Sequence, residues 1–234
     1  SNKRKEEIKI PELINNEKSL TNNELIRINV KDKKFGMLME IYGEACNNLE
    51  KIMKSLQRET KEKYGYDMIN TVTSRIKTPQ SILNKMQRKK YALNYKNMID
   101  SINDIAGVRV VCPLKSDIKK IKRLLKEIPD IDIIEEKDYI RKPKKSGYSG
   151  YHLIMEIPVN YKEHDILVKV ELQIRTMAMD FWATVEHKAR YKTKNKLSFF
   201  DSKKLSLYAK ILNLMDNKIV KIYQKQQKNL LKNM

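Results

Sequence analysis

Residues 166–175 alternate strictly between apolar and polar side chains, which is the pattern of a β-strand with one buried face. The apolar face carries Ile166, Val168, Val170, Leu172 and Ile174. The opposite face ends with the carboxylate of Glu171, the amide of Gln173 and the guanidinium of Arg175, about 6 to 7 Å apart along the strand. Such a strand needs a sheet. Its polar row is either a solvated surface or the floor of a charged active site, and the alternation alone favours the solvated surface.

Helical periodicity and capping residues divide much of the remaining chain into helices. Apolar residues at three- and four-residue steps predict a long amphipathic helix over residues 34–63, which Gly65 ends. Thr78 as the N-cap and Pro79 at the first helical position predict a second helix that runs to about residue 90. Four further helices are predicted at residues 97–103, 116–127 (capped by Ser116), 176–191 and 202–234.

Short apolar and β-branched runs predict the strands. They lie at residues 106–112, 131–136, 150–159 and 166–174, and the last two form a hairpin through residues 160–165. These elements predict an α+β (α/β) fold with a mixed sheet of the five-stranded type, flanked by helices. We expect an N-terminal helical extension at 1–70, a catalytic core at 71–192 and a C-terminal helical extension at 193–234.

Composition limits the class of protein. The 234 residues are 41% hydrophobic, which is enough for a real core, and no apolar run reaches the length of about 18 residues that a bilayer-spanning helix needs. Cys46 and Cys112 lie too far apart to suggest a metal-ligand pair or a disulfide framework, so we expect a cytoplasmic protein that does not engage a membrane. The net charge of +20 indicates an anionic partner, although a lysine-biased proteome would produce the same surplus.

A first basic cluster surrounds the start of the helix at Thr78-Pro79. Arg75 and Lys77 precede the helix, and Ser81 and Lys85 lie on one of its faces. The free N–H groups of a helix N-terminus attract anions, so this cluster suits a triphosphate. The alternative is an ordinary basic, exposed helix start.

A second cluster is Asp104-Ile-Ala-Gly-Val-Arg109, at the entry of a predicted strand. A carboxylate at the edge of a sheet is a common ligand for Mg²⁺, which prefers one or two carboxylates together with phosphate oxygens. A structural turn aspartate and a paired strand arginine would explain the same residues.

A third cluster is the basic loop at residues 137–152, where lysines alternate with tyrosines. Lys144 could contact phosphate, and the ring of Tyr148, placed between Gly147 and a strand, could lie open to stack on a base. The alternative is a mobile, solvated loop.

The segment after the alternating strand is expected to be mostly structural. Phe181, Trp182 and Val185 are predicted core residues, and His187 is expected to be a structural histidine. The pair His164-Asp165 fits a turn better than the metal site of a phosphohydrolase, because no other histidine has suitable spacing.

Four motifs in order make a resemblance specific. Residues 75–191 read R-I-K-x-P-x-S-I-x-x-K, D-I-A-G-V-R, K-D-Y-I-x-x-P-K-x-x-G-Y and E-x-Q-I-R-T-x-A-M-D-F-W-A-x-x-E-H-K. They resemble the nucleotidyltransferase-like (p)ppGpp synthetase domain of the RelA/SpoT superfamily, and in particular the small alarmone synthetases. The resemblance implies a cytosolic, single-domain enzyme of the stringent response that forms homotetramers through its terminal helices. We expect a GTP diphosphokinase without the hydrolase domain of the long family members.

On the donor side the resemblance implies an adenine of ATP held between Arg75 and Arg109. The phosphates of ATP would be held by Lys77, Ser81 and Lys85. Asp104 would bind Mg²⁺, the expected cofactor.

On the acceptor side the resemblance implies that Tyr148 stacks on the guanine of GDP or GTP. Lys144 and His152 would help to place this nucleotide. Glu171 would be the general base for the ribose 3′-hydroxyl and a second ligand of Mg²⁺, and Gln173 would support the site.

Two departures from the family pattern lie on the acceptor side. Family members usually read G-Y-R/Q-S-L-H where this chain has Gly147-Tyr-Ser-Gly-Tyr-His152, and Lys142 replaces the usual asparagine before the loop proline. The resemblance therefore leaves open the preference among GMP, GDP and GTP.

The residues and the resemblance together predict transfer of the β,γ-pyrophosphate of ATP to the 3′-hydroxyl of GDP or GTP, with AMP as the leaving group. Such an enzyme mainly positions two polyanions and neutralises them. A basic RNA-binding protein on an inactive transferase fold is the first alternative, and a transferase that moves NMP and releases pyrophosphate is the second.

Overall fold

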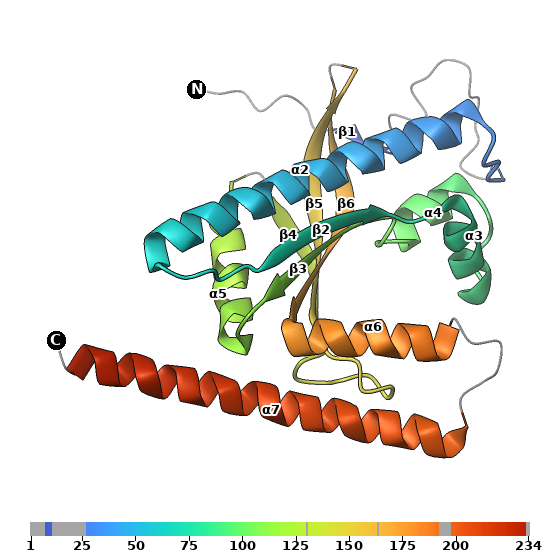
Figure 1. The fold of residues 1–234 in the computed structure, drawn as a ribbon. Coiled ribbons are helices and arrows are strands. Elements are labelled where there is room, and N and C mark those ends of the chain that lie inside the picture. The colour runs from blue at the N-terminus through green and yellow to red at the C-terminus, as the bar shows by residue number, and fades with distance from the viewer. Residues whose placement is uncertain (1–7, 11–26, 130, 163, 192–197, 233–234) are drawn as a thin grey trace, which may run out of the picture.

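The computed structural model describes residues 8–10, 27–129, 131–162, 164–191 and 198–232 (Figure 1). The strands are β1 (Ile8–Lys9), β2 (Thr71–Ile76), β3 (Ala106–Cys112), β4 (Asp132–Asp138), β5 (Tyr151–Tyr161) and β6 (His164–Thr176). The helices are α2 (Lys33–Tyr64), α3 (Pro79–Arg88), α4 (Tyr95–Ser101), α5 (Lys115–Leu125), α6 (Met177–Tyr191) and α7 (Phe199–Lys232).

The strands form one mixed sheet in the order β2-β3-β6-β5-β4. β3 pairs with β6 in parallel, whereas the pairs β2–β3, β4–β5 and β5–β6 are antiparallel. The two-residue strand β1 adds a short parallel pairing to the start of β6. The predicted mixed sheet of five strands is confirmed. Sequence reasoning did not identify β1, and it treated the β2 residues only as the approach to a helix.

The alternation in β6 has the predicted consequence for burial. Its apolar residues from Ile166 to Ile174 are completely buried and face a hydrophobic core. Helix α2 supplies the other half of this core and runs across the sheet (Figure 1). Burial of one complete face of each element accounts for most of the expected stability of such a layer pair.

Local chemistry sets both ends of α2. The Asp32 side chain accepts a hydrogen bond from the Lys34 N–H at the N-terminus. Gly65 ends the helix in the left-handed conformation, with φ at 70°, and its N–H donates to the Lys61 carbonyl. The predicted termination at Gly65 is therefore confirmed.

Other local predictions were wrong. Ser116 does not cap α5: Leu114 occupies the N-cap position, without a side-chain hydrogen bond. The short helix expected at 97–103 is α4, which starts at Tyr95 because the Asn94 side chain accepts from the Asn97 N–H. In α6, Trp182 is buried as expected, but Phe181 is 60% exposed because it lies on the opposite face of the helix.

The terminal helices pack differently. α2 shares its core with the sheet, whereas α7 lies against α5 and α6 below one end of the sheet (Figure 1). The predicted boundary near residue 192 falls in 192–197, outside the described residues, so the division into three segments stays a prediction. None of the helices in the described ranges combines the length and the apolar character that crossing a bilayer requires.

Candidate active site

Register brings the sequence-predicted polar residues together on the sheet face that does not contact α2. Gly107 of β3 lies opposite Glu171 of β6, and Arg109 lies opposite Gln173. On the other side of β3, Gly107 pairs with Arg75. Side chains at such paired and diagonal positions are within reach of one another. The polar row of β6 thus borders the two arginines.

A closed ring of hydrogen bonds holds Glu171. His152 Nδ1 lies 2.9 Å from Glu171 Oε1, and His152 Nε2 lies 2.6 Å from the Tyr148 hydroxyl. Arg175 donates to that hydroxyl from Nη2 at 3.0 Å and to Gln173 Oε1 at 2.9 Å. Gln173 Nε2 completes the ring by donating to Glu171 Oε2 at 2.7 Å. Four side chains from β5, β6 and the loop before β5 therefore fix the carboxylate of Glu171.

Hydrogen-bond chemistry assigns the protons in this ring. An ionised Glu171 can only accept, so His152 must carry a proton on Nδ1. In a neutral His152 the Nε2 atom then accepts from the Tyr148 hydroxyl, whose oxygen in turn accepts from the Arg175 guanidinium. The positive charge of Arg175 is thereby linked through two intermediate groups to the carboxylate.

The surroundings favour the ionised form of Glu171. Burial raises its pKa, but hydrogen bonds from His152 and Gln173 outweigh burial, and the net pKa lies below that of an ordinary glutamate. The Asp104 carboxylate acts in the opposite direction, which shows that these two acids lie close enough to interact.

Asp104 is held by the two lysines that were predicted to bind phosphate. Its carboxylate lies 3.0 Å from Lys77 Nζ and 2.8 Å from Lys85 Nζ. Burial raises the pKa of Asp104, but both ammonium groups outweigh it and the net pKa is lowered. Without a nucleotide, the lysines therefore balance the charge of the aspartate.

The predicted start of α3 is confirmed. The Thr78 hydroxyl accepts from the Ser81 N–H at 3.3 Å and donates to the Ser81 hydroxyl at 2.8 Å, with Pro79 in the first turn. Ser81 is exposed at the helix N-terminus. Its N–H and hydroxyl are thus placed where an anion would approach.

A cavity of 400 Å³ lies between the ring and α6. It is bordered by Arg75, Arg109 and Arg175, a concentration of like charges. Burial, and then repulsion by Arg175, lower the pKa of Arg109. Among the described residues, Arg109 Nε is buried without a hydrogen-bond acceptor, so this donor is available to a ligand or a water molecule. The cavity is suited to an anionic or electron-rich planar group.

The expectation of an open Tyr148 ring was wrong. Tyr148 is only 8% exposed, because the Arg175 guanidinium lies over its ring at 5.1 Å from the centroid. Lys144 lies 4.9 Å from the same centroid. Tyr148 borders the arginine cavity, so a base would have to displace one of these cations in order to stack on it.

Two functional residues were missed from the sequence. Arg175, 6% exposed, joins Tyr148, Gln173 and Asp180, and its distance to Asp180 Oδ1 is 3.0 Å. Asp180 also lies 3.5 Å from Arg109 Nη1 and so orients both arginines. The strand alternation placed Arg175 on the polar face with Glu171, which was the available signal, whereas nothing local indicated Asp180.

Two histidines lie outside the ring. His187 borders the arginine cavity and is exposed, and its role as a structural histidine stays a prediction. His164 opens β6, and Asp165 accepts from Asn160 Nδ2 at 2.8 Å across the hairpin. The pair therefore lies in the first two residues of a strand, next to the hairpin connection, and the prediction that it forms the turn itself was wrong.

The acidic pair fits a magnesium ion. Asp104 and Glu171 offer oxygen donors, and the lowered pKa of each keeps it ionised near neutral pH. Over the described part of the chain no three His, Cys, Asp or Glu side chains form a metal-binding group. Asp104 and Glu171 are the residues that would hold a magnesium ion, and phosphate oxygens and water would have to complete its ligands, as is usual for Mg²⁺.

The chain is similar to known proteins in sequence. Residues 74–196, slightly more than half of the chain, match the family model described as a region found in RelA / SpoT proteins. The GTP pyrophosphokinase YwaC of Bacillus subtilis is 38% identical over 87% of this chain and 96% of its own length. The GTP pyrophosphokinase YjbM of the same organism is 36% identical over 69% of this chain and 75% of its own length.

Solved structures agree with the sequence relatives. The small alarmone synthetase 1 of Bacillus subtilis bound to its product pppGpp superposes with a TM-score of 0.77 at 31% identity, over 83% of this chain and 98% of that chain. The small alarmone synthetase 2 of the same organism gives a TM-score of 0.74 at 36% identity, over 82% of this chain and all of the other. The matched family region, these relatives and the shared fold lead to one conclusion: the chain belongs to the RelA/SpoT family.

Proposed function

We propose that this chain is a GTP pyrophosphokinase that transfers the β,γ-pyrophosphate of ATP to the 3′-hydroxyl of GDP or GTP and releases AMP. The observation that carries the proposal is the closed ring that fixes an ionised Glu171 close to Asp104 and beside the arginine cavity. Relatives over most of the chain are named for the same activity. They give no support to the RNA-binding alternative.

The donor nucleotide is proposed to lie on the β2–β3 side of the site. The guanidinium groups of Arg75 and Arg109 project from neighbouring strands and would hold the adenine between them. Its phosphates would extend toward Lys77, Lys85 and the α3 N-terminus at Ser81. As phosphates arrive, the lysines would exchange their contacts with Asp104 for contacts with phosphate.

The acceptor is proposed to lie on the β5–β6 side. Lys144 is close enough to Glu171 for the carboxylate to affect its pKa, although burial is the largest influence and lowers that pKa. A partly buried cation near the base suits the phosphates of a guanine nucleotide. Tyr148 and His152 border the place where its ribose must lie.

The chemical step requires removal of a proton from the 3′-hydroxyl as its oxygen attacks the β-phosphorus. Glu171 accepts this proton at a carboxylate oxygen, and the carboxylate is kept in position by His152 at Oε1 and by Gln173 at Oε2. A bound Mg²⁺ held by Asp104 and Glu171 would neutralise the charge of the transferred pyrophosphate. The arginines hold the donor so that attack and departure of AMP are in line.

One assay tests the reaction. The chain is incubated with Mg²⁺, ATP and either GMP, GDP or GTP, and the products are separated by anion exchange. We expect AMP together with a guanine nucleotide that carries two more phosphates. Release of pyrophosphate would instead identify an NMP transferase, and absence of turnover with all three acceptors would contradict the proposal.

The acid limb of the pH profile should report Glu171. Because its pKa is lowered, the base is ionised above that pKa, and kcat should fall only as the pH drops below the 4.5 of an ordinary glutamate. Stopped-time assays with circular dichroism at each pH separate titration from unfolding. A limb at about pH 6 to 7, where histidines ordinarily titrate, would indicate His152 as the base instead.

Tyr148→Phe should lower kcat roughly 5- to 100-fold, because Arg175 and His152 each lose a buried partner. The KM for the guanine nucleotide should change little, since the ring remains. Tyr148→Ala should raise that KM by removing the stacking surface. Steady-state kinetics measure both, with Tyr161→Phe on the distant hairpin as the control. An unchanged acceptor KM in the alanine variant contradicts a contact between this ring and the base.

We further propose that the chain forms a homo-oligomer through contacts of α7 and that the complete assembly is a tetramer. This helix exposes a row of large apolar side chains, namely Leu207, Tyr208, Ile211, Leu214, Met215, Ile219 and Ile222. Their three- and four-residue spacing forms one face, and an exposed face of this kind usually marks a protein interface. A second copy of α7 is the proposed occupant.

Ile211→Asp combined with Ile219→Asp should therefore reduce the mass measured by light scattering to that of a monomer. Lys210→Asp, on the same helix but outside the apolar row, should leave the mass unchanged. Retention of the full mass in the double variant would exclude this face as the interface.

A further inference from the structure

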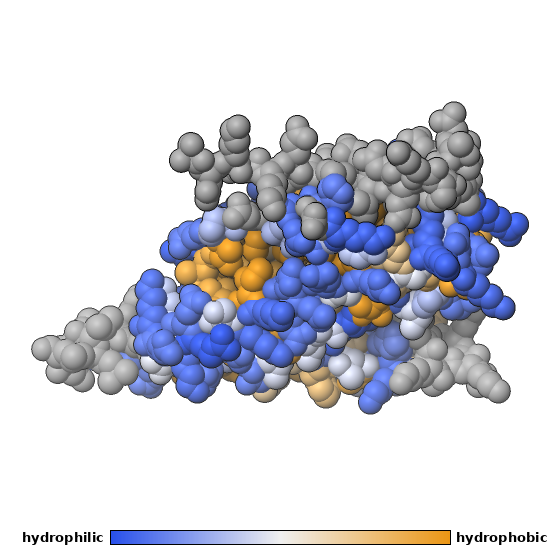
Figure 2. All heavy atoms as spheres, turned by 90° about the horizontal axis from the view of Figure 1, so that it is seen from above, coloured by the Kyte–Doolittle hydropathy of each residue, from blue (hydrophilic) through white to orange (hydrophobic). Residues whose placement is uncertain are grey.

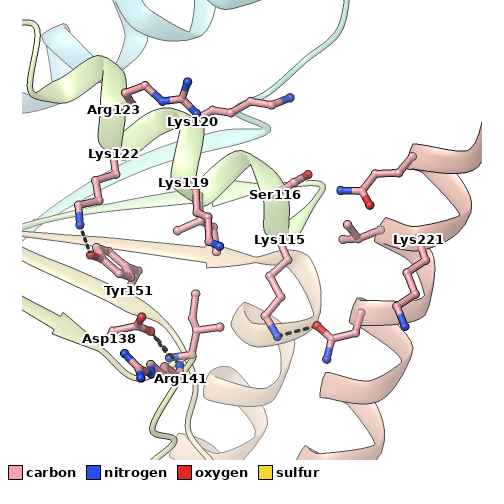
Figure 3. Close-up of a pocket in the computed structure, with 15 residues that line it drawn as sticks. Lys115, Ser116, Lys119, Lys120, Lys122, Arg123, Asp138, Arg141, Tyr151 and Lys221 are labelled. Atoms are coloured by element: carbon pink, nitrogen blue, oxygen red, sulfur yellow. Dashed lines mark hydrogen bonds between the residues drawn. The ribbon is translucent and has the colours of Figure 1, made fainter. Parts of the chain in front are cut away.

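A large cavity among the described residues lies away from the candidate active site. It has a volume of 940 Å³ and is bounded by α5, the end of β4 with the following loop, and α7 (Figure 3). Figure 3 shows Lys115, Lys119 and Lys122 along one side of α5, Arg141 on the loop and Lys221 on α7. Pockets for small ligands usually measure roughly 300 to 1,000 Å³.

The charge of this cavity is strongly unbalanced. Seven of its lining residues are lysines or arginines and Asp138 is the only acid. Asp138 is already engaged, because its Oδ1 atom accepts the backbone N–H groups of Ile140 and Arg141. Hydrophilic residues also cover much of the face seen in Figure 2, with hydrophobic residues exposed between them.

Few of the cations have an anionic partner within the described residues. Lys122 pairs with Glu136 and Lys120 with Asp117, whereas Lys115 donates only to the neutral amides of Asn213 and Asn217. Lys119, Arg141 and Lys221 form no ion pair in the described parts of the chain, and none is buried enough to be needed for packing. Burial lowers the pKa of Lys115, as expected for a cation without a full counter-charge.

The lining favours phosphate groups over nucleobases. Its single aromatic ring is Tyr151, which is 9% exposed and whose hydroxyl is engaged by Lys122 and Glu136. Single-stranded nucleic acid is ordinarily held by several exposed aromatic rings along an open groove. A cationic hollow without exposed stacking surfaces instead suits a compact anion with several adjacent phosphates.

We propose that the cavity between α5, the β4 loop and α7 is a second anion site that binds a polyphosphate group of two or three linked phosphates, with little contact to any attached base. Lys119, Arg141 and Lys221 are its principal ligands. The source of the group is either inorganic polyphosphate or the phosphate chain of a nucleotide.

Inorganic tripolyphosphate is the probe, titrated calorimetrically into the full-length chain at low ionic strength. We expect two sites per chain, one in the candidate active site and one in this cavity. Lys119→Glu with Lys221→Glu should remove one site or weaken it on the order of 10- to 100-fold, given the value of charge-assisted contacts. Lys77→Ala with Lys85→Ala should remove the other.

The matched control is Lys31→Glu with Lys51→Glu, which makes the same charge change at exposed positions outside both cavities. It should keep both sites, and circular dichroism should show all variants folded. Unchanged tripolyphosphate binding in the cavity variant would overturn the proposal. Loss of all tripolyphosphate binding in the Lys77→Ala, Lys85→Ala variant would also overturn the proposal, whether or not the chain transfers pyrophosphate.

Two further titrations in the Lys77→Ala, Lys85→Ala background identify the source. ATP and GTP that bind as tightly as tripolyphosphate support recognition of the phosphates alone. If the nucleotides bind and tripolyphosphate does not, the proposal that the cavity recognises the phosphates alone is overturned. A single-stranded RNA that binds through Lys119 and Lys221 and is not displaced by tripolyphosphate would show a nucleic-acid surface instead.

Discussion

Replacing Glu171 with glutamine is expected to lower kcat for pyrophosphate transfer by roughly 100- to 10,000-fold. The substitution keeps the size and shape of the side chain but removes its capacity to accept a proton from the ribose hydroxyl. It also removes one of the two carboxylates proposed to hold Mg²⁺. Both losses act on the step in which the pyrophosphate is transferred, so kcat should respond far more than the binding of either nucleotide.

The hydrogen-bonded ring around Glu171 limits how a glutamine side chain can fit at this position. His152 Nδ1 can still donate to a glutamine oxygen, but the new amide nitrogen would then face the Gln173 Nε2 donor that now lies 2.7 Å from the carboxylate. One of the two amides must therefore rotate. The thermal midpoint should change by only a few degrees, since a single polar contact is lost while the buried apolar face of β6 is untouched.

The measurement is steady-state turnover combined with calorimetric titration of a non-hydrolysable ATP analogue and of GDP. Glu156→Gln on β5 is the control, because it removes a carboxylate from the same sheet at a position opposite Lys169, remote from the ring. Near-normal turnover in the Glu171 variant would refute its assignment as the base. Loss of nucleotide binding without a specific loss of kcat would assign it to substrate binding instead.

The strand that carries Glu171 could be predicted because its two faces meet different environments. Complete burial of Val168, Val170 and Leu172 imposes a period of two on the sequence. β2 lacks that signal: it is an edge strand whose residues are exposed or only partly buried, so nothing forces alternation upon it. Capping was predictable at Thr78 for a local reason, since its partner Ser81 is three residues away.

The sequence predicted most residues of the candidate site, but it did not predict the hydrogen bonds between them. The family resemblance named Glu171, His152 and Gln173, yet their hydrogen bonds depend on the register between β5 and β6, where His152 lies opposite Gln173. Register is a property of the assembled sheet and of its hairpin. The prediction of an open Tyr148 ring was wrong for the same reason, because Arg175 reaches this ring only after the loop folds back onto β6.

Gly147→Ala is expected to be the most destabilising of the proposed substitutions, at about 2 to 5 kcal/mol. Gly147 has a φ of 90°, a conformation that side chains with a Cβ rarely adopt. A Cβ atom at this position would also lie 2.5 Å from the Cβ of Ala209 on α7. The Ala209 Cβ is bonded directly to the backbone of α7 and cannot rotate away, so the backbone of the loop or of α7 has to move.

Both movements have consequences for the site. The loop carries Tyr148 directly after Gly147, and its turn is closed by the Gly147 N–H bonded to the Lys144 carbonyl at 2.8 Å. α7 is held in place by a hydrogen bond of 2.8 Å from the Thr176 hydroxyl to Asp216. Displacing either element should loosen the ring around Glu171. We therefore expect the acceptor KM to rise as the thermal midpoint falls by on the order of 5 to 15 °C.

A double-mutant cycle with Ala209→Gly separates the two causes. Removing the Ala209 methyl group relieves the contact but not the backbone strain at residue 147, so the paired variant should recover about 1 to 3 kcal/mol relative to additivity. Gly43→Ala in α2, where an added Cβ meets nothing within 4 Å, is the control and should be neutral or slightly stabilising. Additive effects of the two substitutions would mean that the loop and α7 are not in contact. They would therefore contradict a coupling between the terminal helix and the acceptor loop.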